Sequence, residues 1–291
     1  MKVVYSPRYE IALPGHIWPT AKYRLIAERL PPDAALTFVE PRPVSWDDLA
    51  LVHTAEYLDK LRHGTLTPTE VATLELPWLP AFADTFRLMT GGTCLAADAA
   101  LEDGAAAHLG GGLHHAFANH GEGFCPVNDV AVAVRVLQAR GAIRRAAIVD
   151  LDVHHGNGTA MIFERDDTVF TCSMHQQHNY PLFKPKGDLD IGLEDGAGDA
   201  QYLALLAEAL PRVMAHGPDL LFYLAGADPF EGDRLGGLSL TKPGLRERDR
   251  LVIASARAAG VPLAVVLAGG YAADVQETVA IHAATVAALI E

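Results

Sequence analysis

The sequence is poor in cysteine and contains no long apolar run. Only three of its 291 residues are cysteines, Cys94, Cys125 and Cys172, and they form no CxxC pair. A disulfide framework is therefore not expected, and a reducing, cytoplasmic location is the default. No stretch reaches the roughly 18 apolar residues of a membrane-spanning helix. The N-terminus lacks the apolar segment of a secretory signal.

Positive charge is also scarce. The chain has 23 Lys and Arg against 36 Asp and Glu, which gives a formal net charge of −13. Binding to nucleic acid is therefore not expected, because such binding needs a basic surface. Neither a P-loop, nor a GxGxxG motif, nor a Ser/His/Asp triad signature occurs, so nucleotide and serine-nucleophile chemistries lack support.

The apolar pattern predicts one α/β domain over residues 1–291. Short apolar runs alternate with helix-like patterns, which is typical of βαβ units and a parallel sheet. Residues 45–48 resemble a capping box, and residues 176–198 are expected to form a long loop. Strands are predicted at residues 2–5, 36–39, 105–109, 146–149, 168–173, 220–225 and 263–268. Helices are predicted at residues 21–30, 55–63, 81–102, 129–140, 200–216, 243–259 and 274–290.

Four of the predicted strands are followed by glycine and by reactive side chains. In parallel sheets, ligands bind outside the carboxyl ends of the strands. We therefore expect these segments to form one common site, although they lie far apart in the sequence. The segments are GGGLHHA (110–116), DLDVHHGNG (150–158), GAD (226–228) and AGGY (268–271).

Two carboxylates and one imidazole among these residues suggest a metal site. Asp152 and His154 are two residues apart, so on an extended segment they point to the same side, and Asp228 approaches from another strand end. Such a set suits Zn²⁺, and Fe²⁺ could use it as well. Three protein ligands leave a position open for water or a substrate carbonyl. A lone DxH more often caps a loop, but here further reactive residues stand at the neighbouring strand ends.

His114 and His115 follow three glycines, and Tyr271 follows two. One histidine can act as general base towards water while the other assists, and Asp150 is the natural partner for one of them. The hydroxyl of Tyr271 could polarise a carbonyl. The alternatives are a pair of structural histidines and a core tyrosine. Phe124 could line an apolar channel, although alone it fits the core equally well.

Together these segments resemble the zinc-dependent histone deacetylase family, and most closely its class IV branch. The motifs GFCPVND (123–129) and AGADPFEGDRLGGLSL (225–240) extend the four segments above, in that family's order. VYSPRY (4–9), His16, VHTAEYL (52–58) and TGGT (90–93) add to the match. The resemblance implies the arginase/deacetylase fold, a mostly parallel sheet of about eight strands flanked by helices, with the site at the strand carboxyl ends.

The resemblance also implies roles for individual residues. Zinc would bind Asp152, His154 and Asp228. His115 would be the main general base, His114 the second histidine paired with Asp150, and Tyr271 the residue that polarises the carbonyl. The implied structural K⁺ site comprises Asp150, Asp152, His154, Ser173 and Met174, and the implied substrate channel includes Phe124, Gly123 and Gly270.

Asn157 departs from the pattern, because many members have there an Asp that partners the general base. An Asn lacks the negative charge that raises an imidazole pKa, so His115 is expected to titrate at lower pH. His155 stands where some class IV members have Gln, and we attach no consequence to that.

The expected function is zinc-dependent removal of acyl groups, acetyl or longer fatty acyl, from Nε-acyl-lysine of proteins or peptides. The main alternative is deacetylation of small acylated amines such as acetylpolyamines. A binuclear ureohydrolase needs more carboxylates, but Gly156 stands where one acid would be required, and Asp228 is followed by Pro229 and not by a second acid two residues on. A binding module without catalysis is a further alternative. The sequence leaves open the acyl length, the metal used in the cell and the oligomeric state.

Overall fold

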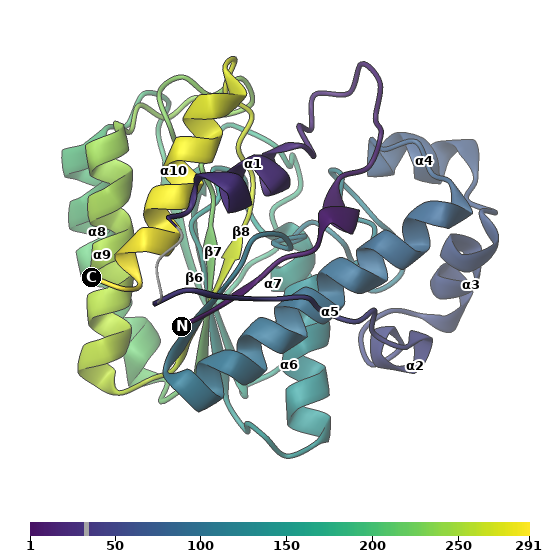
Figure 1. Ribbon diagram of the computed structural model, residues 1–291, viewed down its shortest axis with the longest axis horizontal. Coiled ribbons are helices and arrows are strands. Elements are labelled where there is room, and N and C mark those ends of the chain that lie inside the picture. The colour runs from purple at the N-terminus through teal and green to yellow at the C-terminus, as the bar shows by residue number, and fades with distance from the viewer. Residues whose placement is uncertain (32–34) are drawn as a thin grey trace.

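The computed structural model describes residues 1–31 and 35–291 (Figure 1). Its centre is one eight-stranded sheet with the order β2-β1-β3-β8-β7-β4-β5-β6, and all neighbouring strands are parallel. This confirms the expected parallel α/β fold. The strands are β1 (Lys2–Val4), β2 (Thr37–Val39), β3 (Ala105–His108), β4 (Ala146–Asp150), β5 (Val169–Gln176), β6 (Leu189–Leu193), β7 (Leu220–Ala225) and β8 (Leu263–Leu267).

The central strands are apolar throughout because both faces of the sheet are covered. Strand β7 illustrates this, since all six of its residues are buried. Successive side chains point to opposite faces, so Leu221 and Tyr223 belong to one apolar core while Phe222 and Leu224 belong to the other.

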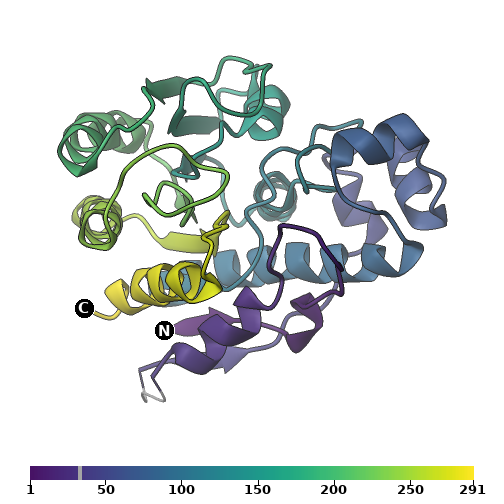
Figure 2. The same ribbon diagram turned by 90° about the horizontal axis from the view of Figure 1, so that it is seen from above.

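Helices form a layer on each face of the sheet (Figures 1 and 2). The first core is closed by α1 (Lys22–Arg29), α8 (Asp199–Ala215), α9 (Lys242–Ala259) and α10 (Val275–Ala288), and the second by α5 (Pro80–Asp103), α6 (Asp129–Ala139) and α7 (Asn157–Phe163). Helices α2 (Trp46–Leu49), α3 (Ala55–His63) and α4 (Pro68–Leu74) pack with α5 around a third core. No helix in the described part of the chain is long and apolar enough to cross a membrane.

Most predicted elements form, and the predicted capping box opens α2, where Ser45 and Asp48 cap each other. The predicted loop at 176–198 was wrong in part, because it contains β6. Asp190 and Gly192 interrupt the apolar pattern of β6, which is an edge strand paired with β5. Helices α4 and α7 were also missed, since seven residues are too few for a clear helical period.

The sheet order places the four expected site segments side by side. They follow β3, β8, β7 and β4, and these four strands are consecutive in the middle of the sheet. Because the strands are parallel, their carboxyl ends lie along the same edge. The segments therefore meet, as the sequence predicts.

Candidate active site

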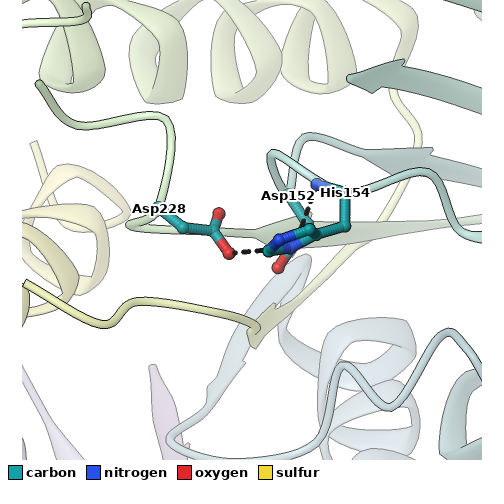
Figure 3. Close-up of side chains that lie close together, drawn as sticks. All are labelled: Asp152, His154 and Asp228. Atoms are coloured by element: carbon teal, nitrogen blue, oxygen red, sulfur yellow. Dashed lines mark hydrogen bonds and ion pairs between the residues drawn. The ribbon is translucent and has the colours of Figure 1, made fainter. Parts of the chain in front are cut away.

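Asp152, His154 and Asp228 converge at the carboxyl edge of the sheet (Figure 3). One ligand atom from each lies within 4.8 Å of the others, and all three residues are buried. Asp152 Oδ1 is 2.9 Å from His154 Nδ1, and Asp228 Oδ2 is 3.5 Å from the same nitrogen. The remaining oxygens accept backbone hydrogen bonds: Gly269 N–H donates to Asp152 Oδ2, and Val153 N–H to Asp228 Oδ1.

The triad fits a divalent cation. Asp228 Oδ2 is fully buried and lacks a hydrogen-bond partner among the described residues, so it retains an unused lone pair where a ligand bond would form. Burial disfavours a charged His154, yet its contacts with Asp152 and Asp228 raise its pKa to about 10. These carboxylates therefore create a field that attracts positive charge, and the ligand types suit Zn²⁺.

Gly269 allows two carboxylates to approach the backbone. A Cβ at this position would overlap Asp228 Oδ2 and would lie 2.6 Å from Asp152 Oδ2. Gly156 is similarly constrained, because a Cβ there would overlap Asp150 Oδ2. An additional acid at position 156, as a binuclear ureohydrolase requires, has no room.

We expect Gly269→Ala to weaken metal binding and to destabilise the protein by about 1–3 kcal/mol, because the methyl group displaces Asp228. Zinc titration and thermal unfolding check this. Gly198→Ala is the matched control, since a Cβ at Gly198 meets only Ser239 O, at 3.7 Å. Equal zinc affinity in the two variants would contradict the close approach at Gly269.

The adjacent histidines have different partners. His114 Nδ1 lies 2.6 Å from Asp150 Oδ2, and His115 Nδ1 lies 2.7 Å from Asn157 Oδ1. Burial opposes a charge on His114, but Asp150 and Asp152 raise its pKa to about 9. Burial, with the neighbouring His114 and His154, holds the pKa of His115 well below its usual value. The two imidazoles therefore differ in basicity although they are adjacent in sequence.

The backbone before the histidines is held by a buried carboxylate. Gly111 and Gly112 have φ of +79° and +69°, which favours glycine. Asp129, at the start of α6, accepts hydrogen bonds from Gly112 N–H at 3.2 Å and Leu113 N–H at 2.7 Å. This anchor aims the next two residues, His114 and His115, at the metal ligands.

An aromatic pocket of about 250 Å³ opens onto Asp152 and His154 of the triad and onto His114 and His115. Phe124 and Gly123 line it, as expected, while Trp18 stacks on Phe124 with ring centroids 6.4 Å apart. Gly270 is not among the described residues that line the pocket. A Cβ there would meet Thr278 and Ala227, and Gly269 lines the pocket instead.

Tyr271 also lines the pocket, with its ring 6.0 Å from that of Phe124. Its backbone N–H donates to Asp233 Oδ2 at 2.6 Å, which fixes the turn after β8. Burial raises the pKa of its hydroxyl well above the usual value, so the hydroxyl stays a donor.

Ser173 lies beside Asp150, as the expected potassium site requires, because β5 and β4 pair in that register. Its hydroxyl lies 3.0 Å from His175 Nδ1, and the next residue, Met174, is fully buried. The potassium site itself stays a prediction.

Sequence reasoning missed three residues near the site: Tyr180, Glu122 and Arg248. Tyr180 lines the pocket, and its ring stands edge-on to His115 at 5.0 Å; its place in the long loop was the available signal. Arg248 is fully buried in α9 and donates to Gly226 O at 2.6 Å. Sequence patterns gave no sign of this, because a charged residue on a helix is usually expected to be exposed to solvent.

Two buried carboxylates and an imidazole at the strand carboxyl ends of a parallel α/β sheet are typical of metal-dependent hydrolases. Comparison with known proteins makes this more specific, since the histone deacetylase domain model matches residues 16–287. The chain therefore belongs to the histone deacetylase family and is a hydrolase acting on amide bonds. The class IV branch within that family stays a prediction.

Relatives match over nearly the whole chain. An uncharacterized protein of Picosynechococcus is 44% identical over 290 residues, which cover 96% of this chain and 95% of that protein. Histone deacetylase 2 of Arabidopsis thaliana is 32% identical over 288 residues, 93% of this chain and 74% of the plant protein. The solved HDA15 HD domain is similar with a TM-score of 0.80 and 27% identity, covering 100% of this chain and 90% of that one.

Proposed function

We propose that the protein is a zinc-dependent amidohydrolase that removes acetyl or longer fatty acyl groups from Nε-acyl-lysine of proteins or peptides. The observation that carries this proposal is the pocket, which has aromatic walls at Phe124 and Tyr180 and the metal ligands Asp152 and His154 in the same cavity. An acylated lysine side chain is an uncharged, narrow stem. Aromatic walls bury such a stem and leave its amide at the polar end.

Zinc is proposed for Asp152, His154 and Asp228, with Fe²⁺ as the alternative ion for the same ligands. A cation bound there supplies Lewis-acid chemistry, which polarises a carbonyl and acidifies water. A structural K⁺ is proposed next to it, at Asp150, Asp152, His154, Ser173 and Met174. The adjacent register of Asp150 and Ser173 supports that second ion.

His115 is proposed as the general base. Its Nδ1 faces Asn157 Oδ1 at 2.7 Å, which favours the tautomer with the proton on Nδ1 and leaves Nε2 as the acceptor. His115 then takes a proton from the attacking water, and a histidine returns one to the leaving lysine amine. The hydroxyl of Tyr271 donates a hydrogen bond to the carbonyl oxygen as negative charge develops there. His114 with Asp150 supplies the second imidazole.

Small acylated amines, such as acetylpolyamines, are the second candidate substrates. Glu75 lines the same pocket, and its carboxylate is exposed. A second ammonium group on the substrate would find a negative partner there. This candidate uses the same chemistry and differs only in what lies beyond the scissile amide.

One assay separates these candidates. The zinc-loaded protein is given a lysine peptide carrying acetyl, octanoyl or myristoyl, with N-acetylputrescine alongside. We expect turnover of the acyl-lysine peptides and its loss when a hydroxamate chelator is added. Turnover of N-acetylputrescine alone would move the substrate to small amines. Bound zinc without any turnover would contradict the proposed amidohydrolase activity and would favour a binding module without catalysis.

A further inference from the structure

Glu122 lies at the end of a hydrogen-bonded chain that begins at His115. Its Oε1 accepts a hydrogen bond from Asn157 Nδ2 at 2.9 Å and another from Tyr180 Oη at 3.0 Å. Asn157 Oδ1 in turn faces His115 Nδ1 at 2.7 Å. Asn157 has no negative charge of its own, but the carboxylate of Glu122 lies one hydrogen bond further from His115.

The backbone around Glu122 is held rigidly, so the position of its carboxylate is imposed by the fold. Glu122 N–H donates to Cys125 O at 3.1 Å, and Cys125 N–H donates back to Glu122 O at 2.9 Å. Inside this turn, Phe124 N–H donates to Leu74 O at 2.8 Å. The side chain of Glu122 is 18% exposed. Burial opposes its ionisation, but hydrogen bonds from His120, Asn157 and Tyr180 bring its pKa below the usual value.

An ionised carboxylate only accepts hydrogen bonds, and this decides how the Asn157 amide is turned. The amide nitrogen faces Glu122, so the amide oxygen faces His115. An amide turned the other way would present N–H to His115 Nδ1 and favour the tautomer that carries its proton on Nε2. That tautomer has no free Nε2 lone pair with which to accept a proton.

We propose that Glu122 is a positioning residue that orients the Asn157 amide, selects the His115 tautomer needed for proton acceptance, and holds Tyr180 against the His115 ring. This inference rests on the proposed function, in which His115 is the general base. Glu122 is not among the described residues that line the pocket, and it acts through its hydrogen bonds with Asn157 and Tyr180.

A double-mutant cycle with Asn157→Asp tests the proposal. In the wild-type background, Glu122→Ala is expected to lower kcat about 10- to 100-fold, a fraction of what a general base contributes, with KM and zinc content little changed. Glu122→Gln should fall between the wild type and Glu122→Ala, because its Oε1 can accept the same two hydrogen bonds while its NH2 group can also donate to an Asn157 amide turned the other way. Glu194→Gln, on an exposed side chain, is the control for loss of one negative charge.

The sign of the effect should reverse in the Asn157→Asp background. An aspartate can accept a hydrogen bond from His115 Nδ1–H through either carboxylate oxygen, but it places a second carboxylate against Glu122, and like charges repel. There, Glu122→Ala should raise kcat, about threefold or more. The same loss in both backgrounds, or a loss under about threefold in the wild type, would overturn the proposal. Tyr180→Phe should lower kcat less than Glu122→Ala does. An equal loss of kcat would contradict the proposal that Glu122 acts through Asn157.

A measurement that needs no turnover separates this inference from the proposed function. The ¹⁵N chemical shifts of His115 report which ring nitrogen carries the proton. We expect the Nδ1–H form in the wild-type protein and a mixture in Glu122→Ala. An inactive wild-type protein with this shift pattern would refute the proposed function but keep the positioning role. Unchanged shifts in Glu122→Ala would refute the positioning role.

Discussion

Asp228→Ala is expected to remove the metal and the activity together. Asp228 Oδ2 is buried without a hydrogen-bond partner among the described residues, and it faces His154 Nδ1 at 3.5 Å. The substitution leaves two ligands, too few for a zinc site, which takes three or four. Because a catalytic metal contributes several kcal/mol of transition-state stabilisation, we expect kcat/KM to fall about 10³-fold or more.

Zinc stoichiometry, measured by elemental analysis, tests the ligand assignment, and a retained cooperative thermal unfolding transition distinguishes loss of the ligand from misfolding. Asp167→Ala is the matched control, since Asp167 is exposed and outside the site, and it should keep both zinc and activity. Asp228→Ala that retains one zinc per chain would refute the ligand assignment, whatever its activity.

Tyr271→Phe is expected to lower kcat by about 10²–10³-fold, the usual cost of removing one oxyanion donor. The ring packs edge-on to Phe124, and the Tyr271 N–H is bound to Asp233, so phenylalanine should occupy the same place. Zinc content and thermal stability should therefore stay the same. Because the lost hydrogen bond forms only as charge develops, KM should change little.

The role of Tyr271 is decided by whether the substitution changes kcat or KM. A loss in kcat under about threefold would place its hydroxyl outside the reaction. An increase in KM at constant kcat would instead indicate that Tyr271 binds the ground state, as a wall of the pocket does. Phe124→Leu is a useful comparison, since it alters the pocket wall next to Tyr271 without removing a donor.

Much of the site could be predicted before any fold was known. Asp152 and His154 follow a buried strand at a spacing of two, and His114 and His115 follow three glycines. Such local patterns predict which side chains share a face and where the backbone turns, because both depend on only a few consecutive residues. The elements that were missed are short, with β6 spanning five residues and α4 seven.

The parallel α/β class, the strands whose ends carry reactive residues, and the residues of the triad all follow from local patterns in the sequence. Which distant side chains meet depends on the tertiary packing and could not be predicted from those patterns. Glu122 reaches Asn157 across 35 residues and Tyr180 across 58, and Arg248 reaches Gly226 from a different layer. The local periodicity of the sequence does not predict such contacts, because they depend on how the layers pack and where the loops cross the edge of the sheet.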